Sequence, residues 1–212
     1  VTGLSFIIQL FSTSYIEKDE KHNNYFVYFN FFVFSMLMLV MSSNFLVMFI
    51  GWELVGLSSY LLISFWSKKT AAAKAGNKAF ILNRVGDFGF LIGLMLILNT
   101  FNTFDFYTIL KNASDVPENT ITLITLFLLL GAFGKSAQFP LFSWLPDAME
   151  GPTPASALIH AATMVTAGVF MLVRISPILQ HSKIAGMVII SFGLLTALLA
   201  AFSAINQYDI KK

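Results

Sequence analysis

The sequence predicts an all-α, polytopic transmembrane helical bundle in which one helix is discontinuous. Of its 212 residues, 57% are hydrophobic and only 11% are charged, whereas soluble domains carry about 25% charged residues. Long stretches contain no Asp, Glu, Lys or Arg, and the longest runs from 22 to 52. Because a helix needs about 20 apolar residues to cross a bilayer, such stretches predict membrane spans. The predicted break follows Lys135, where Pro140 and Pro146 interrupt an apolar run.

Each element follows from this apolar pattern. Residues 1–16 are expected to be the tail of a helix, and 17–24 form a charged loop. Ser43 and Asn44 divide the next apolar stretch into two helices. Beyond them, each remaining apolar stretch of about 20 residues or more predicts one further crossing. In chain order, the expected spans are 25–42, 45–66, 79–99, 120–149, 154–174 and 184–206.

The span 120–149 should break just beyond Lys135. Pro140 has no N–H and frees the carbonyl of Ser136, and Pro146 does the same for Phe142. Irregular backbone at membrane depth is tolerated where it is buried or lines a cavity, and transporters place sites at such breaks. A kinked packing helix whose lysine snorkels to the interface is the alternative. The small residues that would let neighbouring helices approach are Gly131, Ala132, Gly134, Ser136 and Ala137.

The loop charges predict an orientation. One set of loops carries eight cations: Lys18, Lys21, Lys68, Lys69, Lys74, Lys78, Lys211 and Lys212. The opposite loops carry Lys111, Arg174 and Lys183. The positive-inside rule therefore places the first set in the cytoplasm or, in an organelle, in the matrix.

Composition excludes several function classes. A net charge of +2 without a clustered basic face argues against nucleic-acid binding. The chain has no Cys, and its three His are not spaced as metal ligands, so no metal or cofactor site is expected. No nucleotide-binding glycine loop or nucleophile motif is present. No redox or substrate chemistry is therefore expected in this chain itself.

Four ionisable residues are expected near mid-depth in the predicted spans: Glu53, Asp87, Lys135 and His160. Each charged group costs about 2.5–3.5 kcal/mol at a helix centre, so such groups typically mark an ion or proton path. Structural ion pairing is the alternative for Glu53. Arg84 lies one turn before Asp87, which favours a local i,i+3 salt bridge between them.

His160 lies on a predicted polar stripe with Ser156, Thr163 and Ala167 at helical spacing. A core histidine bonded to a hydroxyl group is the commoner explanation of such a pattern. A file of water molecules along the stripe is the alternative.

Four motifs carry a resemblance to a known family. They are GWELVGLSSYLLISFW at 51–66, NRVGDFG at 83–89, GKSAQFPLFSWLPDAMEGPTPASALIHAATMVTAG at 134–168 and QYDIKK at 207–212. Together they resemble the antiporter-like membrane subunits of respiratory complex I. Large subunits of multisubunit sodium/proton antiporters share these motifs.

The resemblance implies a proton-translocating role. It matches Glu53 and Lys135 to the ion pair of a first half-channel, Asp87 to a flanking acid, and His160 to a histidine leading toward the central axis. Arg84 and Trp144 also sit at matching positions. Ser136, Ser156 and Thr163 are further candidates for supporting these groups.

The family fold is a pair of five-helix bundles related by inverted topology. By resemblance, 25–180 is the first bundle and 181–212 the first helix of a second bundle that is otherwise missing, while 1–24 ends a preceding transmembrane helix. Either the gene is split or this is part of a longer chain.

The resemblance also implies partners and surroundings. The expected partners are other complex I membrane subunits, a companion chain supplying the second half-channel, and the lipid bilayer of the mitochondrial inner membrane. NADH, FMN, iron–sulfur clusters and ubiquinone are expected in other subunits. The alternative functions are a subunit of a multisubunit cation/proton antiporter and a half-subunit retained only for assembly.

Overall fold

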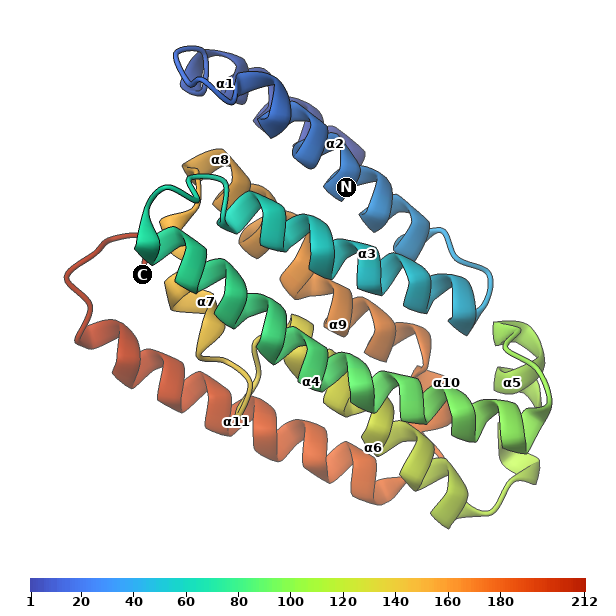
Figure 1. Ribbon diagram of the computed structural model, residues 1–212. Coiled ribbons are helices and arrows are strands. Elements are labelled where there is room, and N and C mark those ends of the chain that lie inside the picture. Colours follow the sequence, from blue (N-terminus) through green and yellow to red (C-terminus); the bar gives the residue numbers. More distant parts are fainter.

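Long helices lying side by side make up almost the whole chain (Figure 1). A computed structural model describes all 212 residues. Six of its helical segments are long and apolar enough to cross a membrane. The helices are α1 (Thr2–Tyr15), α2 (His22–Val40), α3 (Phe45–Ile63), α4 (Thr70–Phe101), α5 (Phe106–Asn112), α6 (Glu118–Lys135), α7 (Trp144–Asp147), α8 (Thr153–Ser156), α9 (Met164–Arg174), α10 (Ser176–Leu179) and α11 (Lys183–Ile205). Short 3-10 turns cover Ala113–Asp115 (η1) and Ala148–Glu150 (η2), and a π-helical segment covers Ala157–Thr163 (η3).

The helix α4 lies at the centre of the bundle, with α3 on one side and α6 on the other (Figure 1). The helix α2 covers α3, and α9 packs against α6. Large apolar side chains fill the interior, and Trp52 and Trp144 are its two largest fully buried members. Along α11, by contrast, most side chains are exposed, and its contacts within the chain are chiefly to α6 and α10.

The predicted spans are confirmed, with shifted boundaries. The break at Ser43–Asn44 is present, because the Asn44 side chain caps α3 by accepting the Val47 N–H at 2.8 Å. The helix α4 begins nine residues before the predicted start at 79. At 32 residues it is about 48 Å long, so its first turns extend beyond the apolar stretch.

The predicted loop sets lie at opposite ends of the bundle. At the charged end, formed by 16–21, 64–69, 147–153 and 206–212, Trp66 bonds to Asp19 at 2.8 Å and Lys78 pairs with Asp147 at 2.7 Å. At the other end, Arg174 donates to the carbonyls of Val40 and Ser42 at 3.2 and 2.6 Å. The loops before and after 120–149 therefore lie at opposite ends of the bundle. This placement agrees with counting 120–149 as a single pass.

The discontinuous helix is confirmed, because α6 ends at Lys135. The Gln138 N–H then bonds to the Phe133 carbonyl at 2.9 Å, and Ala137 adopts a left-handed φ of 50°. An irregular segment, 136–143, leads to the short α7. The carbonyl of Phe142, expected to be freed by Pro146, instead accepts the Leu145 N–H at 3.1 Å.

The helix that carries His160 is also irregular. Its middle is π-helical from Ala157 to Thr163, and the Thr163 hydroxyl donates to the Leu158 carbonyl at 2.6 Å. A π turn adds residues relative to the 3.6-residue period. The prediction that Ser156, His160, Thr163 and Ala167 form one regular stripe assumed the 3.6-residue period. That prediction is wrong, because the π-helical segment changes the spacing.

Candidate functional site

Lys135 is completely buried and forms an ion pair with Asp87. Its Nζ lies 3.4 Å from Asp87 Oδ2, and the two side chains are 0% and 2% exposed. The lysine is the last residue of α6, and the aspartate lies in the middle of α4. Asp87 and Lys135 carry opposite charges, as a buried pair requires, since an isolated buried charge is far more costly.

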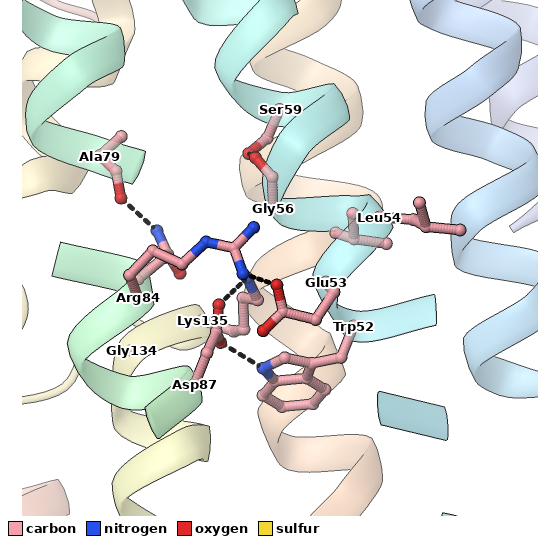
Figure 2. A network of polar contacts seen from close by, with 12 residues as sticks. Trp52, Glu53, Leu54, Gly56, Ser59, Ala79, Arg84, Asp87, Gly134 and Lys135 are labelled. Atoms are coloured by element: carbon pink, nitrogen blue, oxygen red, sulfur yellow. Dashed lines mark hydrogen bonds and ion pairs between the residues drawn. The ribbon is translucent and has the colours of Figure 1, made fainter. Parts of the chain in front are cut away.

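Residues of α3 complete the walls of this pair (Figure 2). The indole Nε1 of Trp52 donates to Asp87 Oδ1 at 2.8 Å, so the two carboxylate oxygens have different partners. Gly56 faces the lysine, because a Cβ added there would lie 2.7 Å from Lys135 Nζ. Any larger residue at position 56 would therefore displace the Lys135 ammonium group.

Glu53 and Arg84 form a second ion pair beside the first (Figure 2). Their side chains are 22% and 40% exposed, so this pair lies nearer the surface of the chain. The prediction of a salt bridge between Arg84 and Asp87 is wrong, because Arg84 pairs with Glu53. The implied ion pair between Glu53 and Lys135 is also absent, because Lys135 pairs with Asp87. The long arginine side chain reaches across to α3, while the short aspartate side chain stays between α4 and α6.

Close contact between two glycines brings the helices of the pair together. Gly86 on α4 faces Gly134 on α6, and a Cβ on Gly86 would lie 3.0 Å from the Gly134 Cα. These glycines directly precede Asp87 and Lys135 in the sequence. Their small size sets the approach of the two helices, which agrees with the predicted role of small residues around Lys135.

His160 is linked to the lysine's helix through Trp144. The two rings lie 5.9 Å apart between centroids, and the Trp144 Nε1 donates to the Gly134 carbonyl at 3.0 Å. Both ring nitrogens of His160 are buried without a hydrogen-bond partner. The expected bond from this histidine to a hydroxyl group is therefore absent. A buried ring with two unpaired nitrogens is able to bind water or to accept a proton.

The three supporting hydroxyl groups have different surroundings. The Ser136 hydroxyl donates to the Val165 carbonyl at 2.8 Å and joins the broken helix to α9. Thr163 bonds within its own π-helical segment. The Ser156 hydroxyl is buried without a partner, like the His160 nitrogens.

Trp52 and Asn83 are the site residues that the sequence reasoning missed. Trp52 holds Asp87. Asn83 lies one turn before Asp87, is 2% exposed, and its Oδ1 has no partner. The signal was available, because a helical spacing of four residues places Asn83 on the face of α4 that carries Asp87.

The arrangement is suited to binding and releasing a proton. It offers a buried amine, a carboxylate partner, a second ion pair and a buried imidazole along adjoining helices. No group of three His, Asp or Glu side chains is placed to hold a metal ion.

Comparison with known proteins identifies relatives. A family model described as "NADH:quinone oxidoreductase/Mrp antiporter, TM" matches residues 42–212. NADH-ubiquinone oxidoreductase chain 5 of Rhizopus stolonifer is 53% identical over 99% of this chain and 32% of its own length. NADH-quinone oxidoreductase subunit L of Neisseria meningitidis is 50% identical over 100% of this chain and 33% of its own. The chain thus spans about a third of the length of the curated relatives it matches.

Solved structures have the same fold. A chain of the Mrp complex from a Dietzia species superposes with a TM-score of 0.92 and 30% identity, covering 99% of this chain and 23% of that one. A chain of the archaeal membrane-bound sulfane sulfur reductase gives a TM-score of 0.86 at 26% identity, covering 98% and 43%.

Proposed function

Because this chain belongs to the transmembrane family shared by NADH:quinone oxidoreductases and Mrp antiporters, we propose that it forms the first proton half-channel of subunit 5 of NADH:ubiquinone oxidoreductase. The relatives at about 50% identity carry the names chain 5 and subunit L. In this proposal the chain moves protons and carries no redox chemistry. NADH, FMN, iron–sulfur clusters and ubiquinone are bound by other subunits.

The observation that carries the proposal is the buried Lys135–Asp87 pair at the break of α6. A lysine that only stabilised the fold would be expected at the helix surface, where its charge is solvated. Here the ammonium group lies between three helices, with one acceptor at 3.4 Å. A single, replaceable partner is what a lysine needs if it is to alternate between holding and releasing a proton.

The energies are of the right size for such a switch. At 3.4 Å and an effective dielectric constant of ~20, the attraction between the two charges is about 5 kcal/mol. Moving one charge against a potential near 180 mV costs about 4 kcal/mol. Loss of the Asp87 attraction is therefore comparable with the work of moving one proton.

Arg84 and Glu53 supply a means of changing that attraction. Arg84 lies one turn before Asp87 on the same helix and is held toward α3 by Glu53. If Glu53 is neutralised, the guanidinium group becomes free to approach Asp87. Asp87 would then bind the lysine less strongly, and the lysine would release its proton. Glu53 thus acts on Lys135 through Arg84 and Asp87 in this proposal.

His160 extends the proposed path away from the lysine. Its unpaired nitrogens lie beside Trp144, and the unpaired Ser156 hydroxyl lies four residues earlier in the chain. Water bound to these groups would carry protons between Lys135 and the remaining part of the channel. The second half-channel lies outside the residues described.

The proposed setting is the mitochondrial inner membrane, among other complex I membrane subunits, with the charged end facing the matrix. Relatives named chain 5 from fungi, animals and plants support this setting. Native purification with mass spectrometry will show whether a companion chain or one longer polypeptide supplies the second half-channel.

The test is Lys135→Met in the assembled complex, followed by measurement of NADH oxidation and of protons moved per NADH. We expect NADH oxidation to continue while the proton yield falls. Lys111→Met, at the opposite end of the bundle, is the matched control and should leave both unchanged. An unchanged proton yield in Lys135→Met would contradict the proposal.

A cation/proton antiporter subunit is the second candidate, favoured by the superposition on the Mrp complex. The two functions differ in their dependence on NADH. Proton movement that requires NADH and quinone supports the complex I role. Sodium-driven proton movement without NADH supports the antiporter role.

A further inference from the structure

The charged end contains a hollow of about 360 Å³ between the α1–α2 loop and the α3–α4 loop. This headgroup hollow takes no part in the Lys135 site. It is lined by Lys18, Asp19, Glu20, Lys21, Phe65, Trp66, Lys68 and Lys69. Four of these eight residues are lysines.

Specific contacts build the walls of the hollow. Asp19 accepts the Trp66 indole N–H and the Lys21 backbone N–H, each at 2.8 Å. The ammonium group of Lys69 lies 4.7 Å from the centroid of the Trp66 ring. Lys21 Nζ donates to the Ser67 hydroxyl at 3.2 Å. These contacts join the two loops and hold the side chains of Lys21 and Lys69 at the hollow.

The hollow has an excess of unpaired positive charge. Lys18, Lys21 and Lys69 make no ion pair, whereas Lys68 pairs with Glu20 at 3.2 Å. The side chains of that pair are 80% and 84% exposed, so the pair contributes little. The Asp19 carboxylate is already bonded to Trp66 and to the backbone. Three ammonium groups are therefore available to an anion.

One groove adjoins the headgroup hollow, and a second, separate groove lies on the neighbouring helix pair. A groove of about 190 Å³ between α2 and α3 shares Lys21 with the headgroup hollow and continues past Tyr28, Tyr60 and Leu61. A groove of about 420 Å³ between α1 and α2 is lined by Phe6, Gln9, Leu10, Thr13 and Phe26. Phe6 and Leu10 are 63% and 56% exposed. An apolar ligand is able to lie along these helices.

We propose that the headgroup hollow and the α2–α3 groove bind one anionic phospholipid. Lys18, Lys21 and Lys69 contact its phosphate group, and an acyl chain lies along Tyr28, Tyr60 and Leu61. The position fits a lipid, because the ends of membrane-spanning helices lie at the level of the headgroups, where tryptophan is also enriched. Basic pockets between transmembrane helices on the matrix side bind such headgroups. An acidic peptide would match the charge but would leave the apolar groove unfilled.

The experiment uses the natively purified complex in vesicles of phosphatidylcholine that contain about one-tenth as much phosphatidylglycerol. At this ratio the anionic lipid is the minor component. The phosphatidylglycerol carries a photoreactive group on its acyl chain, and crosslinked peptides are identified by mass spectrometry. We expect crosslinks on the segments that contain Tyr28 and Leu61. Lys21→Gln and Lys69→Gln should each lower their yield about fivefold.

Controls separate a binding site from general attraction to the charged end. Lys74→Gln removes a lysine from the same end but outside the hollow, and Lys111→Gln removes one from the opposite end. Both should leave the yield unchanged. Because a variant can lose its fold, the unaltered complex is also measured as salt is increased, and its yield should fall.

Three results would overturn the proposal. The first is equal crosslinking by photoreactive phosphatidylcholine, and the second is an equal loss of yield in Lys74→Gln. The third is a protein subunit crosslinked to Lys21 and Lys69 with no lipid crosslinks. None of these results bears on proton movement through Lys135.

Discussion

Lys135 Nζ lies 3.4 Å from Asp87 Oδ2, and these two side chains are the most deeply buried ion pair of the chain. The pair joins the last residue of α6 to the middle of α4. Stability and proton transfer therefore depend on the same two residues. Substitution of either residue should alter both stability and proton transfer. Substitution of Glu53, which belongs to the more exposed pair, should alter proton transfer with less effect on stability.

Asp87→Asn should destabilise the chain strongly, because it leaves the Lys135 ammonium buried without a countercharge. Breaking a buried pair costs about 3–5 kcal/mol. Glu53→Gln breaks the more exposed pair and should cost less. Thermal unfolding in detergent compares them, and Asp87→Asn with Lys135→Met should recover stability. If Asp87→Asn and Glu53→Gln lower the stability equally, the deeper burial of the Lys135–Asp87 pair does not determine the cost.

Gly56→Ala should displace the Lys135 ammonium, since the added Cβ would lie 2.7 Å from it. We expect lower proton yield per NADH and a loss of stability of about 1–3 kcal/mol. Gly193→Ala is the matched control, because nothing lies within 4 Å of its added Cβ. Normal proton yield in Gly56→Ala would show that the ammonium does not need its present position.

Asn83→Leu tests the unpaired Oδ1 beside Asp87. The only bond lost in the chain is from Nδ2 to the Ala79 carbonyl at 2.8 Å, so the cost should be about 1 kcal/mol. Asn30→Leu is the control, because Asn30 makes the same bond to Phe26 at 2.9 Å on an exposed face. A much larger cost at Asn83, measured by unfolding, would mean that a bound water pairs with Oδ1.

Arg174→Met should loosen the end of the bundle opposite the charged end. Arg174 donates to the carbonyls of Val40 and Ser42 and lies 4.3 Å from the Phe106 ring centroid. Loss of these charge-assisted bonds should cost about 2–3 kcal/mol. Hydrogen exchange should rise at the α2–α3 connection and not at the charged end. Lys183→Met, at the same end, should change neither measurement.

Acid should weaken the wall of the headgroup hollow. Hydrogen bonds from the Lys21 backbone and from Trp66 lower the pKa of Asp19 below its ordinary value of 3.8. The stabilisation is therefore fully present above that value and is lost as pH falls through the lower, folded-state pKa. Below pH ~4, the unaltered chain should lose more stability than Asp19→Asn does. Parallel losses in the two proteins would contradict this role of Asp19.

The sequence by itself determined the helical membrane class, the spans, the break after Lys135 and the grouping of the loop charges. These features follow from local rules. Apolar length sets a span, Asn44 caps a helix, and prolines after Lys135 prevent the helix from continuing. None of them needs knowledge of which helices are neighbours.

Only the tertiary structure decided the pairing of the charges. Spacing along α4 favoured Arg84 with Asp87, but the bundle places Glu53 of α3 within reach of Arg84 and Lys135 of α6 against Asp87. The apolar pattern of the sequence also did not predict the hydrogen bond from Trp52 to Asp87. Nor did it predict the π-helical segment around His160. Ion pairs depend on distance in space, and in this bundle the close contact of Gly86 with Gly134 sets that distance.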